Sequence, residues 1–156
     1  MKLNFTGTLS RSPENVWKAV RTFRAVNSEL FPIMQMMCPK DYLDRPFEEF
    51  PLGVFLFHSL VLFLGWIPME VSHARLMQVD PNKGFIEYSE MALAKKWIHR
   101  RILEPSGGGC RITDELEIVP RLSILKPLLW LFVNLLFWNR HRRLRWKFQK
   151  ECSVPA

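Results

Sequence analysis

The sequence predicts an α+β fold in which an antiparallel sheet is covered on one face by a long C-terminal helix. Strand-like stretches separated by turn residues follow one another from about residue 54 to 119, and the period then changes to helical. With 156 residues, of which 48% are hydrophobic and 24% charged, the chain can bury a core. We expect one domain spanning 1–156.

The N-terminal part predicts a strand followed by short helices. Residues 2–9 alternate apolar and polar side chains, as a half-buried strand does. Ser12-Pro13-Glu14 is a helix start, because serine caps, proline suits the first helical position and an acid suits the first turn. A second helical piece is expected over roughly 27–37, and the segment 38–53, rich in proline, is expected to be a loop or irregular edge.

The central part predicts an antiparallel meander. Residues 54–69 form an apolar run of sixteen, shorter than the about 20 that a membrane-spanning helix needs, and favour a buried strand or a bent strand pair over a membrane-inserted segment. Turn residues at 80–84 and 105–109 separate the later stretches. The expected strands that follow the apolar run are 71–79, 85–91, 94–104 and 110–119.

A long helix is expected after Pro127, because residues 128–150 contain no glycine or proline. Its first half, 128–138, is apolar on nearly every side. A helix of this kind must be surrounded by other elements, so we expect this half to be enclosed.

The order of elements resembles the SRPBCC superfamily, the helix-grip fold of START domains, plant pollen allergens and polyketide cyclases. The resemblance rests on "FTGTLSRSPENVW", "LGWIP" and "GFIEYSEM", on Trp97-Ile98-His99 and Thr113-Asp114, and on "FWNRHRRLRWKF" near the end of the chain. It covers nearly the whole chain and is strongest for a bacterial ligand-binding subgroup. It implies a curved sheet wrapped round the last helix, with a largely apolar cavity between them.

Ionisable residues occupy inward positions on the expected strands. Alternation places His99 and Arg101 on one face, Asp114 with the inward set of the next strand, and Glu87 with that of the preceding one. If both hairpins turn at their centres, Glu87, His99 and Asp114 lie at nearly the same level. Three interpretations remain open: a satisfied polar network that fixes register, an anchor for a ligand head group, and a catalytic acid/base pair.

The leading prediction is the binding, for transport or sensing, of a small hydrophobic or lipid-like molecule in that cavity. The alternative is a polyketide cyclase or dehydratase type of enzyme, with His99 as proton carrier oriented by Asp114 or Glu87; the balance leans away from an enzyme, since no nucleophile motif is present. The expected ligand-binding residues, besides apolar side chains of 128–138, are Trp66, Phe85, Glu87, Trp97, His99, Arg101, Asp114, Trp130 and Trp138.

The net charge of +7 comes largely from residues 140–150, which hold six Lys and Arg and no acid. Nucleic acid is not expected as a partner, because the rest of the chain is nearly neutral. Cations at a helix C-terminus complement the macrodipole, and a weak contact with anionic membrane is the alternative, which would make this a peripheral membrane-surface protein. The residues proposed for that contact are Arg140, Arg142, Arg143, Arg145 and Lys147.

Neither a cofactor nor a metal is expected. The histidines at 58, 73, 99 and 141 have no ligand spacing. The cysteines at 38, 110 and 152 match no disulfide framework, which fits reduced thiols in a cytoplasmic protein. The first residues contain no apolar signal segment.

Overall fold

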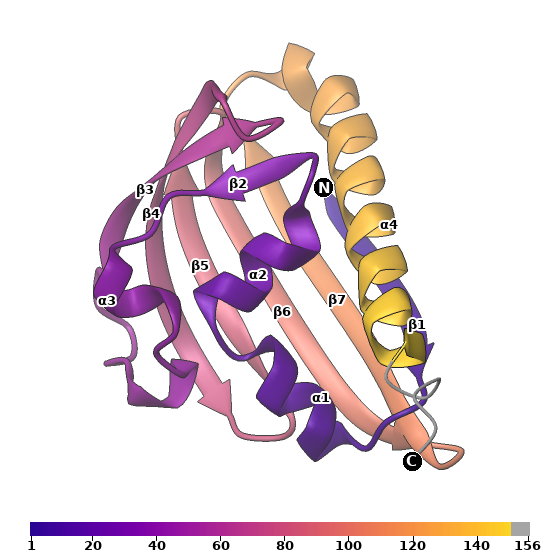
Figure 1. Cartoon of the computed structure of the whole chain (residues 1–156). Helices are drawn as coiled ribbons and strands as arrows, with labels where there is room; N and C mark the ends of the chain where they lie inside the picture. Colours follow the sequence, from indigo (N-terminus) through magenta and orange to yellow (C-terminus); the bar gives the residue numbers. More distant parts are fainter. Residues whose placement is uncertain (151–156) are drawn as a thin grey trace.

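A computed structural model describes residues 1–150 and shows a curled seven-stranded antiparallel sheet that wraps partly round a long helix (Figure 1). The strand order is β1-β7-β6-β5-β4-β3-β2, so the first strand pairs with the last and the meander fills the rest. The α+β prediction with an antiparallel sheet and a C-terminal helix is confirmed. The strands are β1 (Lys2–Leu9), β2 (Met34–Met36), β3 (Phe57–Phe63), β4 (Ile67–Asp80), β5 (Gly84–Met91), β6 (Ala94–Ser106) and β7 (Gly109–Pro120).

Two short helices follow β1, each started by a side-chain cap. In α1 (Pro13–Val20) the Ser12 hydroxyl accepts from the Asn15 amide, and in α2 (Phe23–Leu30) the Thr22 hydroxyl accepts from the Ala25 amide. These caps fix where the apolar faces begin. The apolar face of α1 packs against β6 and β7, and that of α2 packs against α4 and β2.

The expected helix over 27–37 is wrong in its position. α2 ends at Leu30, because Pro32 disfavours helical backbone at the residue before it. The chain then forms β2, whose Met36 amide donates to the Asn27 side chain and whose Met36 carbonyl accepts from it. Asn27 therefore clamps this edge strand to α2.

The segment expected as a loop, 38–53, contains two short helical turns, α3 (Lys40–Leu43) and the 3₁₀ turn η1 (Phe47–Glu49). Phe47 and Phe50 are buried there and pack edge-on against Phe23. Aromatic side chains thus anchor a segment whose prolines suggested an irregular surface.

The apolar run 54–69 is a bent strand pair, as predicted. β3 and β4 are joined by a turn in which Leu64 and Gly65 adopt left-handed backbone, with φ of 52° and 80°. Glycine takes this conformation without steric cost, so Gly65 permits the reversal. Among residues 1–150, no helix combines the length and apolar character required to cross a membrane.

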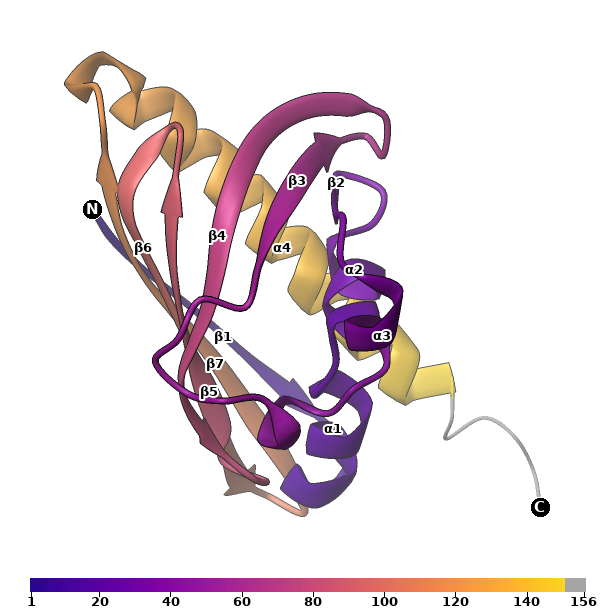
Figure 2. The ribbon, with the colours of Figure 1, turned by 90° about the vertical axis from the view of Figure 1, so that its left-hand side faces the viewer.

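The last helix, α4 (Lys126–Lys150), follows the 3₁₀ turn η2 (Ser123–Leu125) and lies along the open side of the curved sheet (Figures 1 and 2). The side of the helix that faces inward buries Val133, Leu136, Phe137, Leu144 and Phe148. The prediction that 128–138 is enclosed on all sides is wrong, because the sheet covers only one side of the helix. The exposed apolar side chains of this half are Leu128, Trp130, Leu131, Leu135 and Trp138.

Candidate functional site

A cavity of about 280 Å³ lies between the concave face of the sheet and α4. α2 contributes Val26 and Leu30 to its wall. From α4 come Leu128, Leu129, Phe132, Val133, Leu136 and Phe137. The strands and the β5–β6 turn supply Met34, Met36, Val61, Phe63, Met69, Met91, Leu93, Ala94, Trp97 and Ile118. This wall is almost wholly apolar, which is the usual form of a site for small molecules.

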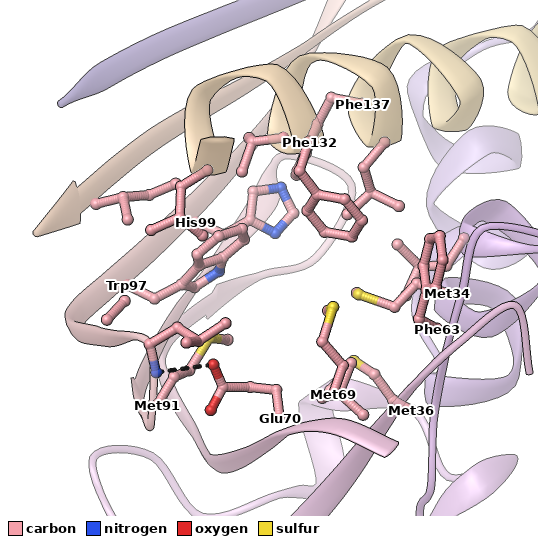
Figure 3. Close-up of a pocket in the computed structure, with 18 of the residues that line it drawn as sticks. Met34, Met36, Phe63, Met69, Glu70, Met91, Trp97, His99, Phe132 and Phe137 are labelled. Atoms are coloured by element: carbon pink, nitrogen blue, oxygen red, sulfur yellow. Dashed lines mark hydrogen bonds between the residues drawn. The ribbon is translucent and has the colours of Figure 1, made fainter. Parts of the chain in front are cut away.

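Four methionines, Met34, Met36, Met69 and Met91, form much of the wall contributed by the strands. Figure 3 shows Met34, Met36 and Met69 on one side of the space, with Trp97, Phe132 and Phe137 across from them. Met69 reaches inward because the β3–β4 register shifts next to Val61, so that Met69 has no partner across the ladder. Methionine is unbranched and fills irregular space, so such a wall can adapt to different shapes.

Three ionisable side chains, Glu87, His99 and Arg140, lie together at one part of the wall. Glu87 is opposite His99 in the β5–β6 register, and Arg140 projects from α4. Glu87 Oε2 lies 3.8 Å from His99 Nδ1, and the Ser89 hydroxyl donates to Glu87 Oε1 over 3.2 Å. They form the polar part of an otherwise apolar surface.

Behind this polar part, Asp114 is the centre of a buried hydrogen-bond network. Its carboxylate accepts from His99 Nε2 at 2.8 Å, from Arg101 Nε and Nη2 at 2.8 and 2.9 Å, and from His141 Nε2 at 2.9 Å. Burial alone would raise the pKa of Asp114, but the Arg101 charge and the hydrogen bonds from His141 and His99 hold that pKa well below its ordinary value. Asp114 is therefore ionised at neutral pH and acts there as an acceptor. In the β6–β7 register Asp114 lies opposite Arg101. The expectation that Asp114 is level with Glu87 and His99 is therefore wrong by one inward position along the strand.

Glu29 extends the network to the two helices and was not found from the sequence. It accepts from Arg101 Nη1 at 3.0 Å and from Arg140 Nη2 at 2.8 Å, and its side chain is 5% exposed. Burial alone would lower the pKa of Arg101, but Asp114 and Glu29 raise it above its ordinary value. Asn139 fixes the end of α2 by donating to the Glu29 and Phe31 carbonyls. The only sequence signal for Glu29 was an acid among the apolar positions of α2.

A second carboxylate, Glu70, was also missed. Its oxygens accept from the backbone amides of Val71, Ala92 and Leu93, so it ties β4 to the β5–β6 turn at the edge of the cavity. Figure 3 shows it below Trp97 with the hydrogen bond to the turn drawn. Because backbone amides satisfy it, Glu70 serves to position the turn.

The proposed ligand-binding residues divide between wall, network and surface. Glu87, Trp97 and His99 line the cavity, and Arg101 and Asp114 lie behind it in the network. The remaining four are placed away from the cavity wall: Phe85 in the core, and Trp66, Trp130 and Trp138 at the surface.

The physical reasons for these four positions differ. Phe85 faces inward but packs edge-on against Phe47 at 5.1 Å between ring centroids, which closes it off from the cavity. Trp66 lies in the β3–β4 turn and is 74% exposed. Trp138 follows the inward Phe137 by one residue, about 100° round the helix, and Trp130 lies on the same outer side, so both are corrected to surface residues.

The basic residues of α4 are not one surface. Arg140 is buried against Glu29, while Arg143 donates to the Ser28 carbonyl and Lys147 to the Ala19 carbonyl. Arg142 is exposed and lies over the ring of Trp138, and Arg145 is exposed. The inclusion of Arg140 in a membrane contact is therefore wrong, because its charge is paired inside the molecule.

Within residues 1–150 no group of three or more His, Cys, Asp or Glu is arranged to hold a metal ion. Cys38 and Cys110 are free thiols in that part of the chain, and Cys152 lies outside the described residues. Burial raises the pKa of Cys38 to about 11 and also raises that of Cys110. Both are therefore poor nucleophiles at neutral pH.

His99 has a defined orientation. Because the Asp114 carboxylate can only accept, His99 Nε2 carries a proton, and Nδ1 is the nitrogen that faces Glu87. A histidine held by a buried carboxylate, with its other nitrogen beside a cavity, could bind a polar ligand group or move a proton.

The curved sheet and the long helix along its open side form a helix-grip fold, and solved structures agree. A START superfamily protein from Mycobacterium smegmatis shares 13% identity, with a TM-score of 0.67 over 96% of this chain and 97% of that one. A protein from Chromobacterium violaceum shares 16%, with a TM-score of 0.69 over 94% and 96%. Ara h 8.0201 shares 10%, with a TM-score of 0.59 over 92% and 97%. At such identities the likeness shows the fold alone.

Within that fold class, the chain belongs to the family described as "Domain of unknown function (DUF8410)", whose model matches residues 7–148. No curated protein matches the sequence. The function is therefore argued from the cavity itself.

Proposed function

We propose that this protein binds a small hydrophobic molecule in the cavity between the sheet and α4, for transport or sensing. The observation that carries the proposal is the cavity itself, about 280 Å³ with an almost wholly apolar wall, whose ionisable lining residues are Glu87, His99, Arg140 and the amide-bound Glu70. Protein interiors are close-packed, so an apolar space of this size is unusual without an occupant. Burial of apolar ligand surface there would supply the binding free energy.

The network behind the cavity supports the same proposal. Asp114 and Glu29 hold His99 and Arg140 in place through hydrogen bonds of 2.8 Å. Held side chains lose little freedom when a ligand binds, so a site supported in this way is preorganised. Arg101 also connects β7 with α2, because it donates to Asp114 on the strand and to Glu29 on the helix.

The test is titration with N-phenylnaphthylamine, a neutral dye that fluoresces in apolar sites. Ala94→Phe places a ring into the cavity wall, where Ala94 is buried, and should weaken dye binding about tenfold or more. Ala92→Phe, two residues earlier and exposed, is the matched control and should bind as the wild type does. Equal affinities for the two variants, with both shown to be folded by thermal melting, would contradict the proposal.

A second function, contact with an anionic membrane surface, is favoured by the outer side of α4. Leu131, Leu135 and Trp138 are 61%, 50% and 53% exposed and follow one another at helical spacing. Arg142 and Arg145 are exposed further along the helix, and residues 118–150 contain no acid. Exposed tryptophan and leucine beside cations are typical of helices that lie in the membrane interface.

A second copy of the chain fits this surface less well. A symmetric dimer that packs the two α4 helices parallel would place their cations opposite one another with no acids to offset them. Co-sedimentation with vesicles of anionic or neutral lipid measures the membrane contact directly.

Catalysis at His99 stays a prediction. The Asp114–His99 pair supports it, and its test is turnover by His99→Ala, which should be lost while dye binding is kept. An unchanged rate would remove the enzyme interpretation.

A further inference from the structure

We infer that the ligand carries a hydrogen-bond donor, a hydroxyl or an amine, at the end that meets Glu87 and His99, and that the site discriminates against carboxylic acids. The inference rests on the proposed function, since it names the class of molecule that the same cavity takes. It depends on which polar groups of the wall still have bonding capacity, and on the charges around them.

The two groups nearest each other on the polar part of the wall are both acceptors. Glu87 receives one hydrogen bond, from Ser89, and a carboxylate can accept several. His99 uses its Nε2 proton on Asp114, so a neutral ring presents the Nδ1 lone pair. Glu87 Oε2 and His99 Nδ1 are 3.8 Å apart, which is too long for a direct hydrogen bond. Both atoms can therefore accept a hydrogen bond from a donor group of the ligand.

The nearby cations are already matched by carboxylates. Arg101 is bound by Asp114 and Glu29, and its side chain is wholly inaccessible. Arg140 donates from both Nε and Nη2 to Glu29 Oε2 and is 4% exposed. Two guanidinium groups therefore face two carboxylates, and Glu87, with 19% of its side chain exposed, adds a negative charge that no cation among residues 1–150 offsets. Glu70, elsewhere in the wall, is a further carboxylate, and its oxygens are taken up by backbone amides.

This distribution decides which head group is favoured. A ligand carboxylate would lie beside Glu87 in a wall of low polarity, where like charges repel strongly. A hydroxyl can donate to Glu87, and an amine can donate to Glu87 and to His99 Nδ1. If His99 takes up a second proton, a hydroxyl can accept from Nδ1 and still donate to Glu87, so the preference for a donor remains.

The experiment displaces N-phenylnaphthylamine at neutral pH with a straight-chain alcohol, amine and carboxylic acid of matched length. We expect the alcohol or the amine to compete at concentrations about tenfold below those of the acid. The alcohol and amine arms show whether a neutral donor or a cation is preferred. Glu87→Gln removes the charge while keeping an acceptor for Ser89, and should reduce the difference between acid and alcohol to about twofold or less.

Glu90→Gln is the matched control, because Glu90 lies on the same strand, faces the outer side with Arg75, and should leave the ranking unchanged. An acid that competes as well as the alcohol in the wild type, or a ranking that Glu87→Gln does not alter, would overturn the inference and leave the proposed function standing. Failure of the dye and of every competitor to bind would overturn both. Thermal melting of each variant establishes that it is folded.

Discussion

At the scale of single residues, the buried charges are explained by mutual pairing. Asp114 takes four hydrogen bonds from three side chains, and Glu29 takes those of Arg101 and Arg140. A buried ion without such partners costs several kcal/mol, so the network must form as a whole. Gly7 belongs to the same arrangement, since a Cβ there would lie 3.0 Å from His141 Nδ1.

Asp114→Asn should lower the free energy of unfolding by about 3 kcal/mol at neutral pH, because Arg101 loses a buried counter-charge. The folded-state pKa of Asp114 lies below its unfolded value, so its contribution is present above the ordinary aspartate range and is lost as pH falls. The wild type and the variant should therefore become more alike in stability below about pH 4. Urea unfolding over a pH series measures this.

Asp44→Asn is the control for that series. Asp44 also has a lowered pKa, caused first by its hydrogen bond from Arg24, but it lies in an exposed pair. Its removal should hardly change stability, since water screens such pairs. A loss at Asp44 as large as that at Asp114 would contradict the assignment of stability to the buried network.

At the scale of elements, the sequence predicts which side chains of a strand point inward, but it does not predict which side of α4 faces the sheet. The period of two placed His99, Arg101 and Asp114 on the inward face without knowledge of the fold. In α4 every position from 128 to 133 is apolar, so the pattern did not tell which side meets the sheet. The sequence pattern places Arg140 among the surface cations, because its partner, Glu29, is 111 positions away in the chain.

The outer side of α4 has a test at this scale. Replacing Leu131 and Leu135 together with Glu should abolish binding to anionic vesicles, because the apolar contact is lost and repulsion is added. Replacing Val71 and Met77 with Glu adds the same charge on exposed positions of β4 and should retain most binding. Vesicle co-sedimentation with increasing salt is the measurement. Equal binding to neutral and anionic vesicles, or equal loss in both variants, would exclude the membrane contact.

At the scale of the whole molecule, the cavity exists because sheet and helix meet along only part of their length. Away from the cavity the rings of Phe23 in α2 and Phe47 in η1 pack edge-on in the core. Figure 2 shows β3 and β4 curving over at the other end of the sheet. The resemblance to the SRPBCC superfamily predicted this architecture. It does not predict the methionine wall, because the sequence pattern favours helix at 34–36 and the inward turn of Met69 depends on an irregular register.

The central claim is that a hydrophobic molecule occupies this cavity, and the methionine methyl groups report on it most directly. The chain has seven methionines, of which Met34, Met36, Met69 and Met91 line the cavity while Met37 and Met77 are about half exposed outside it. In NMR spectra of protein with isotope-labelled methionine methyl groups, we expect a straight-chain alcohol to shift the four cavity signals and to leave Met37 and Met77 unchanged. Shifts confined to Met37 and Met77, or no shift at a saturating concentration, would contradict the claim.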